Sequence, residues 1–226
     1  MSTQFSIGDA QRRDSQMEAD IPMTPEDEKV ILGLVYSPKH PTRVGSPEEV
    51  LRHFGVSDGR KLGLKLLKEA IESRDADGVE LALIVASEFG ITMDHLDMLL
   101  QLSSADWHYM HEAVVSRLGE LRTPTAVDAL YRAAVWIPDY LDYDENRALA
   151  RKAIWALGGT PGPEAEAALV RLRDSDSEIV RKRAEAQLER RQNLILQRRE
   201  GFAYRSSNMS EPHVTNDYKP SSPKGE

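Results

Sequence analysis

The 226-residue sequence contains no cysteine, few aromatic residues and no long apolar run. The lack of cysteine excludes disulfide bonds, thiolate catalysis and cysteine-based zinc sites, and it fits a reducing compartment. No stretch reaches the roughly 18 consecutive apolar residues that a membrane span needs, and the start shows no targeting pattern. We therefore expect a cytoplasmic protein that does not contact a membrane.

The residues that are abundant favour helices. Aromatic residues make up only 6% of the chain, whereas alanine, leucine, glutamate and arginine are frequent. These are strong helix formers, and the 40% hydrophobic content is enough to bury one sizeable core. We predict an all-α protein.

Charge is distributed unevenly along the chain, whose net charge is −8. Residues 75–145 contain 14 acidic side chains against three basic ones, whereas residues 146–200 contain 12 basic against eight acidic. An acidic middle favours a basic partner and disfavours nucleic acid, because contacts to phosphate dominate nucleic-acid affinity.

Composition and helix-start signals divide the chain into four parts. Polar, low-hydrophobicity sequence predicts disordered tails at 1–22 and 199–226. Thr24 and Ser46, each followed by proline and acids, predict the N-caps of two helices within 23–56, joined by a proline-rich connector. Residues 57–198 then show regular helical periodicity.

This regular part repeats itself. Leu118-Gly119 aligns with Leu157-Gly158 at an offset of 39, while other apolar positions align at offsets of 31 and 29. The unit is therefore a helical hairpin of about 30 residues. We predict eight helices in four hairpins, at 60–71, 79–89, 93–102, 107–121, 125–136, 146–158, 164–173 and 177–192. An acid is expected near four helix starts, at Asp77, Asp106, Asp144 and Asp176.

The 39-residue spacing contains an insertion of about eight residues within "WIPDYLDYDE", residues 136–145. Insertions in repeat proteins emerge as loops on one face, often the binding face. Aromatic residues surrounded by acids are typical of a protein interface with a basic partner. The predicted partner-binding residues are Trp107, Trp136, Asp139, Tyr140, Asp142, Tyr143, Asp144 and Glu145. In the alternative, Trp136 and Tyr140 fill the hairpin core while the acids solvate the loop and cap the next helix.

The short Ala/Leu helices, "ARKAIWALGG" and the following "EAEAALVRLRDSDSEIVRKRAEAQL" resemble the HEAT-repeat family over residues 58–190. With its insertion, the chain is also similar to small bacterial HEAT-repeat proteins of toxin–immunity type. The resemblance implies a solenoid of about four hairpins with a concave binding face. Fold alone does not assign a function.

Enzymatic members of this fold class provide alternatives. HEAT-type hydroxylases hold iron with several His-Glu pairs, whereas this chain has only His111-Glu112; we expect His108 and His111 to be surface residues of one helix. HEAT-like DNA glycosylases need a basic groove with stacking aromatics, and we expect Trp155 to lie in the core or between repeats. A phycobilin lyase-like activity has no testable motif. No phosphate-binding loop or nucleophile motif is present.

These observations predict a non-catalytic protein-binding module without metal or cofactor. The specific expectation is an immunity protein that neutralises a cognate, basic toxin through an acidic concave face and the 136–145 loop. A general adaptor is the alternative, and a HEAT-fold enzyme is the second alternative. The sequence makes no prediction of oligomeric state.

Overall fold

A computed structural model describes residues 23–36 and 42–208, so the predicted N-terminal tail and residues 209–226 of the C-terminal tail lie outside the described residues. The described part contains α-helices and three short 3-10 turns and no strand, which confirms the all-α prediction. The helices are α2 (Pro25–Leu32), α3 (Pro47–His53), α4 (Gly59–Ser73), α5 (Ala76–Phe89), α6 (Leu96–Leu102), α7 (His111–Leu121), α8 (Val127–Val135), α9 (Ala148–Gly159), α10 (Pro163–Leu172) and α11 (Glu178–Asn208).

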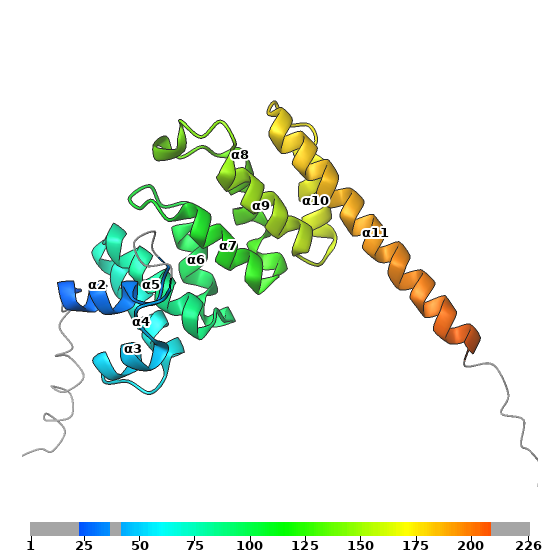
Figure 1. The fold of residues 1–226 in the computed structure, drawn as a ribbon. Coiled ribbons are helices and arrows are strands. Elements are labelled where there is room, and N and C mark those ends of the chain that lie inside the picture. Colours follow the sequence, from blue (N-terminus) through cyan, green and yellow to red (C-terminus); the bar gives the residue numbers. More distant parts are fainter. Residues whose placement is uncertain (1–22, 37–41, 209–226) are drawn as a thin grey trace, which may run out of the picture.

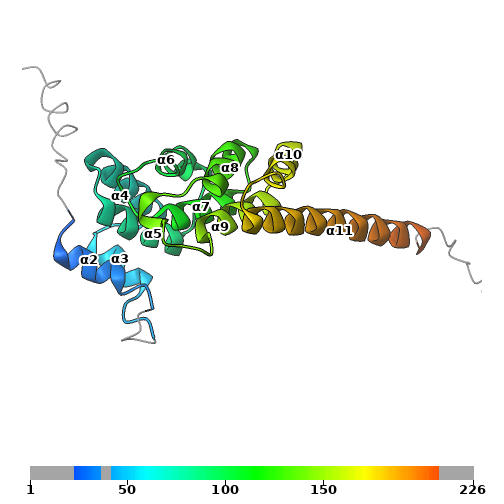
Figure 2. The ribbon, with the colours of Figure 1, turned by 90° about the horizontal axis from the view of Figure 1, so that it is seen from above.

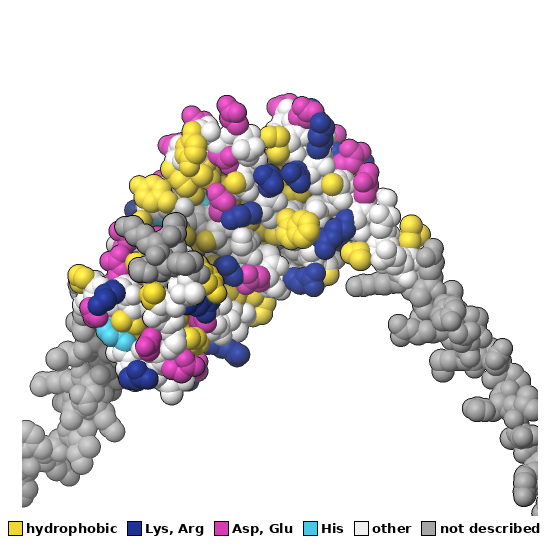
Figure 3. All heavy atoms as spheres, viewed as in Figure 1, with side chains coloured by type: hydrophobic (Ala, Val, Ile, Leu, Met, Phe, Trp, Pro, Cys, Tyr) yellow, Lys and Arg dark blue, Asp and Glu magenta, His cyan; other side chains and the backbone are white. Residues whose placement is uncertain are grey.

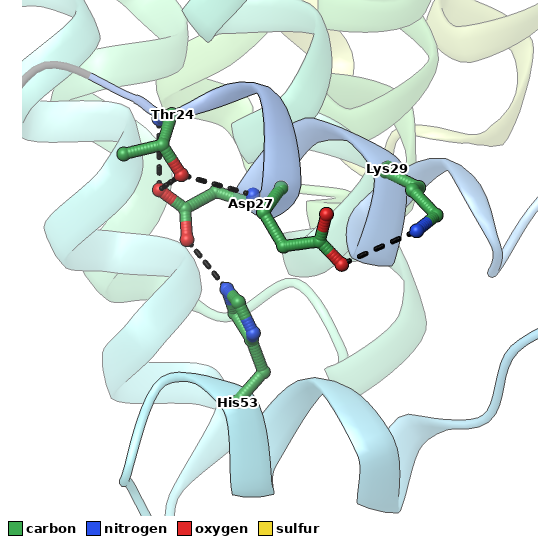
Figure 4. A network of polar contacts seen from close by, with 5 residues as sticks. Thr24, Asp27, Lys29 and His53 are labelled. Atoms are coloured by element: carbon green, nitrogen blue, oxygen red, sulfur yellow. Dashed lines mark hydrogen bonds and ion pairs between the residues drawn. The ribbon is translucent and has the colours of Figure 1, made fainter.

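Helices α2 and α3 begin as predicted, with capping boxes. The Thr24 side chain accepts a hydrogen bond from the Asp27 backbone N–H, and the Asp27 carboxylate accepts one from the Thr24 N–H at 2.8 Å. Ser46 and Glu49 form the same arrangement in α3. Asp27 also contacts Nε2 of His53 at 2.6 Å, and this contact joins the two helices (Figure 4). The capping residue of one helix therefore also fixes its neighbour.

The helices from α4 onward form two layers (Figures 1 and 2). Consecutive helices pair as α4 with α5, α6 with α7, α8 with α9 and α10 with α11, the pairing that the sequence predicts. In one layer α5 contacts α7, α7 contacts α9 and α9 contacts α11. The helices α4, α6, α8 and α10 lie in the other layer, on the opposite side of these contacts (Figure 2). Most contacts therefore link neighbours in the series.

Small residues allow the helices to approach closely. A Cβ added to Gly63 of α4 would lie 2.9 Å from Cα of Ala86 in α5. Gly119 of α7 faces Ala156 of α9 in the same way, and Gly158 of α9 faces Gln187 of α11. The two Leu-Gly pairs that align at an offset of 39 thus occupy equivalent positions against the next helix of their layer.

The core is a continuous apolar cluster that runs through the helices from α2 to α11. Helix α5 is buried over most of its length, as its almost wholly apolar sequence predicts. No helix in the described part of the chain is both long and apolar enough to cross a membrane.

Helix α11 is longer than predicted. It continues to Asn208, past the expected start of the tail at 199, and its last turns project away from the other helices (Figure 1). Arg191 fixes its inner half, because the guanidinium donates to the carbonyls of Leu157, Gly158, Thr160 and Gly162 at the end of α9. Carbonyls in the last turn of a helix have no partner further along that helix, although the Leu157 carbonyl also accepts from the Thr160 N–H at 3.2 Å. Arg191 therefore sets the position of α11 against α9.

Candidate functional site

The loop between α8 and α9 covers the predicted insertion. It contains a 3-10 turn at Asp139–Leu141, and both Pro138 and Leu141 are buried. Part of the insertion therefore lies in the packed core. Because these two side chains pack inward, the loop is anchored at its middle and is part of the fold.

Asp144 has a capping role, as expected. Its carboxylate accepts hydrogen bonds from the backbone N–H of Asn146 at 3.0 Å and of Ala148 at 2.5 Å. This satisfies donors at the start of α9, where the backbone of Arg147 has a positive φ of 53°. The other predicted helix-start acids differ in position. Asp77 lies in the first turn of α5, whose N-cap is Asp75, and Asp176 lies just before α11, whereas Asp106 lies in the turn before α7, which begins only at His111.

His108 and His111 lie below this loop and are buried. The expectation of two surface histidines on one helix is wrong, because His108 precedes α7 and both side chains are only 1% exposed. Their rings stack with centroids 4.2 Å apart. Nε2 of His108 contacts the Leu102 carbonyl at 2.9 Å, and Nε2 of His111 contacts the Ala105 carbonyl at 2.7 Å. The two rings therefore bind carbonyls in the turn between α6 and α7.

These contacts assign the protons on both rings. A carbonyl can only accept, so Nε2 carries the proton in each ring. Nδ1 of His108 accepts from the Met110 N–H at 3.0 Å, and Nδ1 of His111 accepts from the Tyr140 hydroxyl at 3.1 Å. Burial lowers the pKa of both histidines, and for His111 burial together with the neighbouring His108 lowers the pKa to about 4. Both rings are neutral at pH 7.

The hydrogen bonds of His108 and His111 determine whether these rings are free to bind a metal ion. Coordination needs a free lone pair on an imidazole nitrogen, and in both rings the single lone-pair nitrogen accepts a hydrogen bond. Over residues 23–36 and 42–208, no three His, Asp or Glu side chains gather in a group that could hold a metal ion. The two histidines organise the turn and the loop above it.

The rings around the histidines form a connected cluster. Trp136 meets His111 edge to face at 4.8 Å, and Trp107 meets His108 in the same way at 5.3 Å. Tyr140, which donates to His111, is also in edge contact with Tyr109 at 5.3 Å. Trp107, Trp136 and Tyr140 are partly buried. They support the surface above them.

Above this cluster lies an exposed ridge, which we define as Tyr109, Ile137, Tyr143, Asp139, Asp142 and Glu145. Tyr143 is 81% exposed and Tyr109 is 66% exposed. The three acids are exposed as well. Figure 3 shows hydrophobic side chains gathered over the α8–α9 loop with acidic side chains at its outer edge. The ridge thus combines apolar surface and negative charge on a supported loop.

The sequence identified the loop but not Tyr109 or the histidine platform. The sequence feature that could have revealed them is the cluster "WHYMH" at 107–111, which lies in the turn of the preceding hairpin. Turns of consecutive hairpins emerge on the same side, so that "WHYMH" meets "WIPDYLDYDE".

A second surface feature, formed by other residues than the ridge, is basic. A hollow of about 670 Å³ lies across α7, α9 and α11, and its charged lining consists of five basic side chains and the acid Glu120. The charge at this hollow is thus opposite to that of the ridge, and the acidic concave face stays a prediction. Negative charge suited to a basic partner is found on the ridge instead.

Comparisons with protein-family models, with curated proteins and with solved structures found no match for this chain.

Proposed function

We propose that this chain is a helical-repeat protein that binds a basic protein partner through the exposed ridge and carries out no chemistry of its own. The main support for the proposal is the exposure of Tyr143, whose side chain is 81% exposed on a loop that buried residues hold in place. Tyrosine and tryptophan are the residues most often found as interface anchors. A large exposed aromatic ring on an ordered loop gives contact area at low entropic cost.

The negative charge on the ridge favours a basic partner. Asp139, Asp142 and Glu145 lie beside the apolar side chains and are exposed. Acids at the edge of an interface accelerate association with a basic protein and suppress association with acidic ones. The resemblance to small bacterial HEAT-repeat proteins of toxin–immunity type narrows this proposal to an inhibitor of a basic toxin. A general adaptor with the same ridge is the alternative.

The architecture supports a repeat protein of this class. Paired helices whose layers contact only their neighbours in series are typical of solenoids, which bind proteins along an extended surface. The histidines that an enzymatic role would use are neutral, buried and hydrogen-bonded at both ring nitrogens.

The first prediction concerns Tyr143. The chain is immobilised, a partner is captured from the native cell lysate and purified, and its association and dissociation rates are measured against variants. We expect Tyr143→Ala to weaken binding by roughly 2 kcal/mol or more, mainly through faster dissociation, without changing the melting temperature. Reversing Asp139 and Asp142 to lysine should slow association and flatten its salt dependence.

The matched control is Tyr36→Ala. Tyr36 is also exposed, at 69%, but it follows α2 and is not part of the ridge. Its replacement should leave both rates unchanged. If Tyr143→Ala binds like the unsubstituted chain, or if Tyr36→Ala loses as much affinity, the ridge is not the binding surface. Tyr140→Ala is unsuitable here, because it removes a partner of buried His111 and would affect folding.

A further inference from the structure

The hollow across α7, α9 and α11 is a second surface, separate from the ridge and opposite in charge. Its walls come from three successive helices of one layer, and basic side chains gather around it on the face shown in Figure 3. The basic and aromatic side chains that line the hollow are Arg122, Arg151, Lys152, Trp155, Arg183 and Arg190.

Most of this positive charge is not neutralised. Arg122, Arg151, Arg183 and Arg190 form no ion pair with any residue that the structure describes, although the chain as a whole has a net charge of −8. Arginines that surround one hollow repel one another and create a positive potential within it.

The two nearby acids are already engaged. Glu120 pairs with Arg117, and Glu112 of α7 pairs with Lys152 of α9 at 2.9 Å. An anion that enters the hollow would therefore meet four guanidinium groups that form no ion pair with the described residues, of which Arg190 also donates to Oε1 of Gln187 at 3.4 Å. A guanidinium group suits phosphate well, because it offers a planar fork of donors.

Trp155 provides a different kind of surface in the same hollow. We expected it in the core or between repeats, but its side chain is 61% exposed, so that expectation is wrong. The Arg190 guanidinium lies 4.5 Å from its ring centroid. Such a cation–π contact orients the indole and keeps a positive charge beside it. Helix α9 thus presents a flat aromatic ring within a group of arginines.

We propose that this hollow binds single-stranded nucleic acid, with arginines on successive phosphates and one base stacked on Trp155. A positively charged groove with an aromatic stacking platform is the combination that such ligands require. An acidic peptide would satisfy the arginines but would not use the exposed part of the Trp155 ring, which is 61% exposed although Arg190 lies beside it. A duplex keeps its bases inside the stack and would have to flip one out to reach Trp155.

The negative net charge of the chain does not prevent this binding. At physiological ionic strength the Debye length is about 8 Å, so exposed charges beyond that distance are largely screened. The potential inside the hollow is set mainly by the arginines that line it. The site is independent of the ridge and of the function proposed for it.

The test uses the full chain and a fluorescently labelled oligothymidylate of about eight nucleotides, within the usual site size of such proteins. We expect binding that weakens with salt and quenching of tryptophan emission. Trp155→Leu should abolish most of the quenching and weaken binding by roughly 5- to 150-fold. Arg151→Gln with Arg183→Gln should weaken binding at least about tenfold and reduce the salt slope by about 0.7 for each lost phosphate contact.

The control is Arg132→Gln with Arg173→Gln, which removes the same charge from exposed positions outside the hollow. This double variant and Tyr143→Ala should bind the oligonucleotide like the unsubstituted chain, with all variants equally helical by circular dichroism. The proposal is overturned if Trp155→Leu retains full affinity or if the control loses as much as the groove variant. It is also overturned if polyglutamate or a duplex of equal length competes as well as unlabelled oligothymidylate.

Discussion

Burial keeps the imidazole of His111 neutral and makes the folded protein sensitive to acid. In the unfolded chain the pKa of a histidine is about 6.5, whereas burial and His108 lower the pKa of His111 to about 4 in the folded protein. Below pH 6.5 the unfolded chain therefore binds more protons than the folded one. The stability that this group contributes is fully present above pH 6.5 and is lost as pH falls toward 4.

We predict that the free energy of unfolding falls between pH 6.5 and 4, by an amount on the order of 3 kcal/mol for His111 alone. Burial lowers the pKa of His95 and His108 as well, and these groups act in the same direction. Urea unfolding at half-unit pH steps measures the slope. His111→Phe should be less stable at pH 7 but should show a shallower slope, and an unchanged slope in this variant would contradict the assignment.

The histidines also show what the sequence alone could not predict at this scale. Their spacing is equally compatible with a solvated face and with burial. What decides between them is whether backbone carbonyls nearby can accept a side-chain donor, and here the turn after α6 presents the carbonyl of Ala105 and that of Leu102, which also accepts from the Ala105 N–H. That requirement depends on the path of the turn, which no local residue preference specifies.

Whole helices were more predictable than the faces they present. Thr24 and Ser46 predicted helix starts correctly, because a capping box depends only on residues three positions apart. Trp155 was misassigned, because its exposure depends on where α7 and α11 contact α9. For the same reason the burial of Leu141 in the loop was not foreseen. Features that depend on contacts within one helix can be predicted from sequence. The exposure of a side chain depends on contacts between helices, and these cannot be predicted in the same way.

Close packing of α4 on α5 leads to a prediction at the element scale. Alanine normally stabilises a helix interior by about 1 kcal/mol relative to glycine. At Gly63, however, the new Cβ would lie 2.9 Å from Cα of Ala86, so that a helix backbone would have to move. We expect Gly63→Ala to lower the free energy of unfolding by about 1–3 kcal/mol in urea titrations.

The loss of stability in Gly63→Ala is compared with that in Gly158→Ala. There the new Cβ meets the end of the Gln187 side chain, which can change rotamer. Its loss of stability should be clearly smaller than that of Gly63→Ala. Equal stability of Gly63→Ala and the unsubstituted chain would mean that α4 and α5 are not in this close contact.

At the scale of the whole molecule, the serial contacts of α5, α7, α9 and α11 predict that a local change is felt mainly by neighbours. Arg191 tests this, because one guanidinium spans carbonyls from Leu157 to Gly162. A lysine ammonium cannot reach all of them. We expect Arg191→Lys to speed amide hydrogen exchange in α11 and at the end of α9, corresponding to about 1–3 kcal/mol, while α4 and α5 stay unchanged.

Arg173→Lys, an exposed substitution at the end of α10, should leave exchange unaltered throughout. Uniformly faster exchange in Arg191→Lys, including α4 and α5, would instead indicate a single cooperative unit.

The glycines that admit the next helix of the layer also determine how long the array of helices can be. Leu118, Leu157 and Leu188 occupy equivalent positions, and the residues that follow them are Gly119, Gly158 and Glu189. In α7 and α9 the glycine lets another helix approach, whereas α11 has an exposed glutamate at that place. A bulky, charged side chain at that place opposes the close approach of a further helix backbone. We therefore expect neither an added hairpin nor a second copy of the chain to continue the array from α11 through a contact as close as those at Gly119 and Gly158.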